Sequence, residues 1–345
     1  MNIENIKQKE FKKLKAKENL LGWVLISPYM LFFMVFSLIP VVVGFVFSFM
    51  KYNPYNMENN SFVGLQNYIN IFNPDNPIST QFWSSFAPTL IFCAVAVPCM
   101  IVIPLVLAYF INLQPPGYKL FRAIIYLPNV LSVTVLGIVF SGMFQGDEYG
   151  LINAWLGTNI KWLSGQPFDG DFLRWAVMLL VSIWWQTGSN FIILAAALRN
   201  VPKSLYEACE MDGGSRWQLI RRVTLPNIKS SLNLCLFTTL IGYLGLFGQP
   251  YTLYDSGNAN TLVSPMMFIN YYLSGITYAS QMGYICACAI VFGLIVMIFS
   301  LIQQGITEDK KRSEKRKKEY NLYARNRKFL QEYSAEATAG NGVRR

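Results

Sequence analysis

The sequence predicts an all-α, polytopic membrane protein with six transmembrane helices and both termini in the cytoplasm. Of its 345 residues, 53% are hydrophobic and only 14% are charged, whereas a soluble domain carries about 25% charged residues. The charged residues lie in blocks, separated by long apolar stretches that contain no Asp, Glu, Lys or Arg. The basic blocks also alternate along the chain, which predicts a single orientation in the membrane.

The apolar stretches are each long enough to cross a bilayer as a helix. They cover residues 21–50, 83–111, 123–144, 175–198, 230–250 and 279–304. The first is too long for a cleavable signal peptide and has no small-residue cleavage site after it. The second contains Pro88, Pro98 and Pro104. We expect neighbouring helices to supply donors for the backbone carbonyls that such prolines leave without an N–H partner.

The distribution of Lys and Arg gives the orientation. The N-terminal 20 residues, the link between spans two and three, residues 199–229 and the tail after span six hold 26 of the 29 basic residues. Basic residues favour the cytoplasmic side, so these four segments are predicted to lie there. The net charge of +10 is therefore explained by topology, and no nucleic-acid partner is expected. The predicted organisation is a basic segment (1–20), a six-span transmembrane domain (21–304) and a basic tail (305–345) attracted to membrane lipid.

The composition excludes several kinds of chemistry. The chain has no histidine, which removes histidine-based triads and the HExxH zinc motif. The dipeptide Gly-Lys never occurs, so no Walker A motif is present and the chain cannot bind ATP by that motif. The six cysteines show neither disulfide nor zinc-ligand spacing. We therefore expect no catalytic residue, metal site or cofactor in this chain. The spans also lack the carboxylate of a proton-coupled carrier, so energy comes from a partner or transport is passive.

One cytoplasmic loop, residues 201–226, carries the most specific pattern. It reads VPKSLYEACEMDGGSRWQLIRRVTLP. Ser204 followed by Glu207 predicts a capped helix of about two turns, and Gly213-Gly214 predicts its end. A second short helix is then expected to lead into Leu225-Pro226. A short amphipathic helix beneath a membrane bundle suits docking of a cytoplasmic partner, although such a loop can also serve as a simple connection.

This loop resembles the EAA loop of binding-protein-dependent ABC importer permeases, in their carbohydrate branch. The resemblance is carried by Leu205, Tyr206, Glu207, Ala208, Asp212, Gly213, Val223, Leu225 and Pro226. Two positions depart from that pattern, because Cys209 and Gly214 each stand where the family has alanine. The stretches LISPYMLFFMVFSLIP, FVGLQNYINIF and FRAIIYLPNVLS are also similar to that branch, so the resemblance covers most of the chain.

The resemblance implies a type I ABC importer permease fold in the cytoplasmic (inner) membrane of a bacterium. It implies a non-catalytic subunit that pairs with a second, homologous permease. Two ATPase subunits, which bind ATP and Mg²⁺, would dock on the EAA loop, and an extracellular solute-binding protein would deliver a carbohydrate. The docking residues implied are Tyr206, Glu207, Ala208, Asp212, Gly213, Leu225 and Pro226. Closure of the ATPases would then switch the permease pair between inward-open and outward-open states.

Uncharged polar residues in spans four and five are the candidates for the substrate pathway. Ser182, Gln186, Ser189 and Asn190 recur at helical spacing in span four, and Thr239, Tyr243 and Phe247 do so in span five. Amides and hydroxyls bind sugar hydroxyls, and aromatic rings stack on sugar faces. The resemblance implies the same two regions. The alternative is that these residues bind neighbouring helices, which is common in membranes.

Other classes remain open from the residues alone. A stand-alone secondary transporter or channel would need intramembrane charge or a selectivity filter, and neither is evident. An ABC permease for amino acids, peptides or phosphate is a further alternative, for which we would expect a charged pathway residue.

Overall fold

The computed structural model describes residues 19–146, 148–163, 172–254, 263–275 and 281–305. These residues are almost entirely helical, which confirms the all-α prediction. They divide into two compact units. The described parts of residues 1–84 and 268–292 form the first unit, and those of 85–267 and 293–345 form the second. Most of the predicted basic segments, 1–20 and 305–345, lies outside the described residues.

The first unit begins with a long apolar helix, Asn19–Phe47, which contains η1 (Met34–Leu38) and α2 (Ile39–Phe47). Its most apolar window is not buried by any described part of this chain. An antiparallel ribbon follows, in which Met50 pairs with Phe62. The ribbon and the helices after it are β1 (Met50–Lys51), β2 (Ser61–Phe62), α3 (Gln66–Ile71) and α4 (Pro77–Ser84).

A buried amide holds the ribbon to α3. Asn67 Nδ2 donates hydrogen bonds to the carbonyl oxygens of Ser48 (2.8 Å) and Met50 (3.0 Å). Those carbonyls lie where the chain leaves α2, so the amide satisfies backbone acceptors that no helix pairs. The helix Met282–Gly305 begins in this unit, and a side chain at Gly283 would collide with the Met50 carbonyl. Glycine at 283 therefore permits the helix to approach the ribbon closely.

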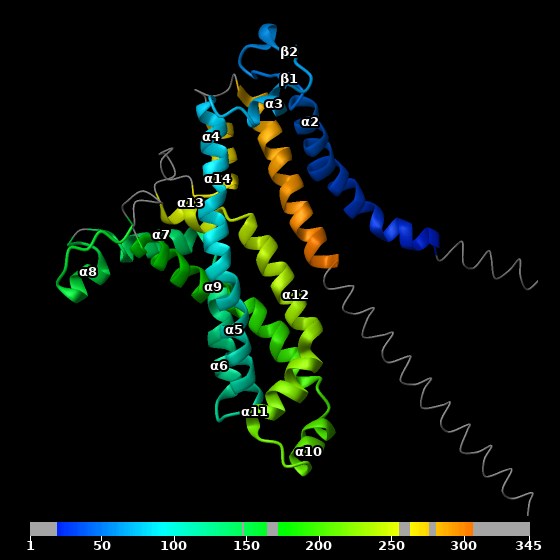
Figure 1. Ribbon diagram of the computed structural model, residues 1–345, viewed down its shortest axis with the longest axis vertical. Helices are drawn as coiled ribbons and strands as arrows, with labels where there is room; N and C mark the ends of the chain where they lie inside the picture. Colours follow the sequence, from blue (N-terminus) through cyan, green and yellow to red (C-terminus); the bar gives the residue numbers. More distant parts are fainter. Residues whose placement is uncertain (1–18, 147, 164–171, 255–262, 276–280, 306–345) are drawn as a thin grey trace, which may run out of the picture. The chain divides into compact units, whose positions relative to one another are not determined.

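The second unit is built around three packed helices, α5 (Phe86–Asn112), α9 (Phe172–Arg199) and α12 (Leu225–Leu244) (Figure 1). Its core contains fully buried Met100, Phe191 and Leu194. The remaining elements are α6 (Tyr118–Tyr126), η3 (Leu127–Val130), α7 (Val133–Met143), α8 (Leu151–Leu156), α10 (Lys203–Met211), α11 (Arg216–Gln218), η4 (Leu219–Thr224) and α13 (Gly248–Leu253). Helix α14 (Pro265–Ser274) crosses from this unit into the first.

Most predicted spans coincide with helices. Four described helices are long and apolar enough to cross a membrane, namely Asn19–Phe47, Pro77–Asn112, Phe172–Arg199 and Met282–Gly305. A bent pair of helices supplies a fifth candidate. The predicted window 230–250 overlaps α12, which has 20 residues and is not in this set. The count of six spans and the cytoplasmic termini therefore remain predictions.

The third predicted span is not one continuous helix, and the expectation of a single helix over 123–144 is wrong. Residues 118–130 and 133–143 form two helices that meet at 94°. Pro128 lies in η3 just before the break, and Leu131 and Ser132 are extended. Ser132 then begins α7, because its Oγ accepts from the Val135 N–H, as a typical N-cap does. Trp185 Nε1 donates to the Leu131 carbonyl at 3.0 Å, so α9 satisfies an acceptor that the break exposes.

Candidate functional site

The first candidate site is the loop between α9 and α12, which Figure 1 shows at the end of the second unit where α12 begins. Helix α10 runs from Lys203 to Met211, close to the predicted two turns. Asp212 is its C-cap, and Gly213 follows with φ +74°, a conformation that favours glycine. The predicted capping box of Ser204 and Glu207 is wrong, because Pro202 is the N-cap and makes no side-chain cap.

The capping box of this loop lies one helix later. Ser215 Oγ accepts from the Gln218 N–H, and Gln218 Oε1 accepts from the Ser215 N–H. Helix α11 continues into the π-helix η4, and α12 then begins at Leu225 with Pro226 in its first turn. The structure therefore contains the predicted second short helix, followed directly by span five. Ser215 and Gln218 have the same Ser-x-x-Glu/Gln spacing as Ser204 and Glu207, but they were not selected in the sequence analysis.

The loop residues divide into a packed face and an exposed face. Tyr206 and Leu225 are half-buried, and both pack against a hydrophobic cluster that includes Leu198 and Val223. The other five predicted docking residues, which are Glu207, Ala208, Asp212, Gly213 and Pro226, are exposed. Two large apolar residues that the sequence reasoning did not select, Met211 and Trp217, are 89% and 66% exposed. The sequence alone could have identified these two residues, because both are large apolar residues in a polar loop.

The two positions that depart from the EAA pattern touch each other. A Cβ at Gly214 would lie 2.7 Å from Cys209 Sγ and 2.7 Å from the Cys209 carbonyl oxygen. The Gly214 N–H also donates to that carbonyl at 2.9 Å. Real Cβ atoms do not approach other atoms this closely, so glycine at 214 and cysteine at 209 form one packed turn.

The predicted pathway residues of α9 and α12 include buried side chains and exposed side chains, and Asn190 is one of the buried ones. Asn190 is 6% exposed, and its Nδ2 donates to the Met100 carbonyl of α5 and to Thr239 Oγ1 of α12, both at 2.9 Å. Pro104 has no N–H to offer to the carbonyl four residues earlier, which is that of Met100. Asn190 therefore joins three helices and satisfies a carbonyl freed by proline, as the sequence analysis expected of neighbouring helices.

Two further pathway candidates are buried hydroxyls. Ser182 and Tyr243 are 0% and 1% exposed. Neither Ser182 Oγ nor the Tyr243 hydroxyl has a hydrogen-bond partner within the described part of the chain. Phe92 packs edge-on against the Tyr243 ring, with centroids 5.3 Å apart, and also contacts Trp175 of α9. Both hydroxyls therefore lie buried in the aromatic-rich core without a hydrogen-bond partner in the described part of the chain. Buried polar groups usually have such a partner.

The remaining candidates are accessible. Ser189 is exposed, while Gln186 and Phe247 are half-buried. Ser189 Oγ donates to the Gln186 carbonyl of its own helix. Thr238, which the sequence reasoning passed over in favour of Thr239, is exposed on α12. These side chains are accessible in the described part of the chain, and Thr238 Oγ1, like Ser189 Oγ, donates to a carbonyl of its own helix.

The outer end of α9 carries a buried charge. Arg174 is 2% exposed, and its guanidinium carbon lies 3.8 Å from the centre of the Tyr254 ring. The Tyr254 hydroxyl donates to the Arg174 carbonyl at 3.1 Å. Burial raises the pKa of Tyr254 and outweighs the opposite effect of Arg174, so the phenol stays protonated as a donor. This pair fastens the start of α9 to the segment after α13.

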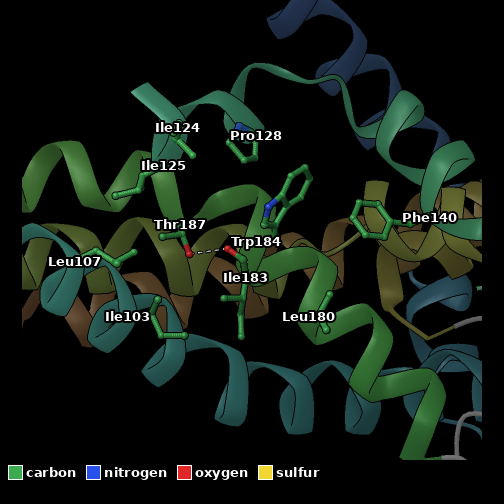
Figure 2. A pocket seen from close by; sticks show the side chains of 10 residues that line it. All are labelled: Ile103, Leu107, Ile124, Ile125, Pro128, Phe140, Leu180, Ile183, Trp184 and Thr187. Carbon is green, nitrogen blue, oxygen red and sulfur yellow. Dashed lines mark hydrogen bonds between the residues drawn. The ribbon is translucent and has the colours of Figure 1, made fainter. Parts of the chain in front are cut away.

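A cavity of about 680 Å³ lies where the bent third span meets α5 and α9 (Figure 2). Its walls are apolar apart from Thr187, whose hydroxyl already donates to the Ile183 carbonyl at 2.6 Å. Trp184 lines it and packs edge-on against Phe140. No predicted pathway residue lines this cavity. A sugar would find too few hydrogen-bonding groups there, so this cavity is not the candidate substrate site.

Apolar helices of membrane-spanning length, a helix exposed beneath a three-helix core and uncharged polar side chains on that core define an integral membrane permease. Comparison with known proteins identifies its family. Residues 81–311 match the family described as "Binding-protein-dependent transport system inner membrane component". The chain belongs to this family, as the loop pattern implied.

Individual relatives agree with this assignment. The arabinooligosaccharides transport system permease protein AraP of Halalkalibacterium halodurans is 30% identical over 295 residues, or 84% of this chain and 88% of AraP. The lactose transport system permease protein LacF of Rhizobium radiobacter is 31% identical over 309 residues, or 86% and 97% of the two chains. A chain of a crystal structure of a bacterial ABC transporter that imports the acidic polysaccharide alginate shares the fold. It has a TM-score of 0.71 and 21% identity, with 87% of this chain and 98% of that chain covered.

Proposed function

We propose that this chain is the permease subunit of an ABC importer that moves a neutral carbohydrate into a bacterial cytoplasm by alternating access. ATP hydrolysis takes place in separate ATPase subunits that dock on α10 and bind ATP and Mg²⁺. An extracellular solute-binding protein delivers the sugar, and a second, homologous permease completes the pathway. The names of the relatives support the carbohydrate class, because AraP and LacF belong to transport systems for arabinooligosaccharides and lactose.

The docking proposal rests on one observation, which is that α10 has one packed face and one exposed face. One face, with Tyr206 and Cys209, packs against the cluster formed by the ends of α5, α9 and α12. The other face leaves Glu207, Ala208 and Met211 exposed. A short helix that is anchored on one side and presents a mixed acidic and apolar face on the other suits insertion into a groove of a partner.

Charge reversal tests this docking. Glu207→Lys should leave membrane insertion intact but separate ATP hydrolysis from uptake in the purified transporter. Gly213→Pro should do the same, because proline cannot adopt the positive φ of residue 213. Lys119→Glu is the matched control, since Lys119 is an exposed residue of α6 outside the loop. Uptake that survives both loop changes at the level of the control would show that the docking proposal is wrong.

The neutral character of the sugar is proposed from charge. The windows 175–198 and 230–250 contain no Lys or Arg, whereas an acidic polysaccharide would need a cationic partner. The accessible side chains of Gln186 and Ser189 offer neutral donors and acceptors. Gln186→Ala should raise the KM for uptake of a neutral oligosaccharide without loss of the complex, and Ser141→Ala on α7 is the control. Preferred uptake of uronate oligomers would contradict the neutral assignment.

The proposed second permease has a surface to cover. The helix Asn19–Phe47 has no buried residues in its most apolar 18-residue window. Within the described part of its own unit this span has no covering neighbour along that window, so it is well placed to bind another subunit. Crosslinks from cysteines introduced at Phe32 and Phe36, in native membranes, should reach a second permease chain. Crosslinks to lipid alone would contradict this assignment.

A further inference from the structure

The inner face of α10 is hydrogen-bonded to the start of α12. The Tyr206 hydroxyl lies 3.2 Å from Thr224 Oγ1, and Thr224 is the 2% exposed last residue of η4. Thr224 Oγ1 donates its one proton to the Leu219 carbonyl at 3.3 Å. A hydroxyl has a single proton to donate, so Tyr206 is the donor to Thr224.

This hydrogen bond lies beside a weak point in the backbone. Pro226 has no N–H, so the helical ladder from η4 into α12 lacks one bond at this position. The preceding π-helix is itself an irregular turn of the kind that occurs at functional sites. The Asn227 side chain adds a hydrogen bond across Pro226, because its Nδ2 donates to the Val223 carbonyl at 2.7 Å. A side chain therefore reinforces the junction of η4 and α12 at the position where Pro226 removes a backbone hydrogen bond.

Apolar packing runs alongside the polar connection. The Tyr206 ring packs against the same buried cluster as Val223 and Ile228, which flank the proline. A displacement of α10 is therefore transmitted to η4 through Tyr206. It is transmitted past Pro226 through Asn227 and the buried cluster. Without the Tyr206 hydroxyl, only van der Waals contact would link the middle of α10 to the last residue of η4, and such contact resists sliding less well than a directed hydrogen bond.

We propose that the Tyr206–Thr224 hydrogen bond is a positioning contact that makes α10 and α12 move together during transport. This inference rests on the proposed docking of an ATPase on α10. It assigns Tyr206 to transmission of movement within the chain, whereas Glu207 and Ala208 on the exposed face contact the partner. Hydrolysis without this hydrogen bond would move α10 but displace α12 less.

The test follows α12 itself, so it needs no knowledge of the sugar. Thr238→Cys, an exposed position on α12, serves as the reference in the full transporter purified through this chain. Labelling of the introduced thiol by a membrane-impermeant maleimide is measured by mass spectrometry, with and without ATP and vanadate. Because Tyr206 lies on the packed face of α10 and not on the exposed docking face, adding Tyr206→Phe should preserve ATPase co-purification and ATP hydrolysis. The ATP-dependent change in labelling should fall roughly threefold to tenfold, as expected for one lost hydrogen bond.

Three comparisons separate transmission from general packing. Tyr109→Phe, whose ring packs against the same cluster, should leave the labelling change intact. Thr224→Ser keeps the acceptor and should behave as the reference, and Thr224→Val combined with Tyr206→Phe should be no worse than either alone. An undiminished labelling change in Tyr206→Phe would overturn the inference, and so would loss of the ATPase from that variant. Absence of any ATPase from the reference would instead defeat the proposed docking.

Discussion

Replacement of Asn190 by alanine should lower the stability of the bundle, because Asn190 joins three helices. The change removes two interhelical hydrogen bonds, to the Met100 carbonyl and to Thr239 Oγ1. Such bonds in membrane proteins average about 0.6 kcal/mol and reach about 1.7 kcal/mol. The expected loss is therefore about 1–3 kcal/mol. The upper part of this range is favoured, since Pro104 leaves the Met100 carbonyl without a helical donor.

The assay is thermal unfolding of the detergent-solubilised transporter, followed by size-exclusion chromatography. A loss of 1 kcal/mol corresponds to about 2–4 °C in Tm for chains of 150–250 residues. Thr239→Val removes one of the two bonds and should give a smaller decrease than Asn190→Ala. Ser189→Ala is the control, because that exposed hydroxyl bonds within its own helix. An unchanged Tm for Asn190→Ala, accompanied by loss of uptake, would refute the packing role and assign Asn190 to the sugar.

Three further contacts can be tested by substitution. Gly188→Val should prevent stable assembly, measured as loss of the monodisperse peak, because a Cβ at 188 would lie 3.0 Å from a carbonyl oxygen of α6. Arg174→Gln should lower the Tm through loss of a buried cation–π contact worth about 2 kcal/mol, whereas Tyr254→Phe should cost less because it keeps the ring. Gly214→Ala should impair ATP-coupled transport, and adding Cys209→Ala should restore part of it, since one of the two atoms that a Cβ would meet is Cys209 Sγ; equal defects in the single and double variants would contradict that interlock.

The sequence predicted the helices better than their shape. The apolar windows located the long helices to within a few residues, apart from the start of the second, because span length is set by bilayer thickness. The break in the third span was missed although Pro128 lies inside its window. A proline shows that a hydrogen bond is lost but not that the chain then turns by 94°. That angle depends on Ser132, which begins a new helix, and on Trp185, which binds the exposed carbonyl.

The candidate site was predicted in part. Gly213-Gly214 correctly predicted where α10 ends, since a glycine helix end is local structure that depends on near neighbours, whereas the capping box predicted at Ser204 and Glu207 was wrong. Helical spacing grouped Ser189 with Asn190, but adjacent residues point about 100° apart on a helix. One is exposed and the other is buried between three helices. Spacing shows which residues share a face, but the packing of α5, α9 and α12 decides which face is buried.

The helix Asn19–Phe47 has a consequence for synthesis of the protein. Its apolar window receives no burial from the rest of the described chain, so a copy made without a partner would carry an unassembled span in the bilayer. Incompletely assembled proteins are removed in cells by chaperones and proteases, so the cellular level of this chain should follow that of the second permease proposed to cover the helix. Production of the protein for biochemistry should therefore succeed when the partner genes are expressed together with it, and yield little stable material when it is expressed alone.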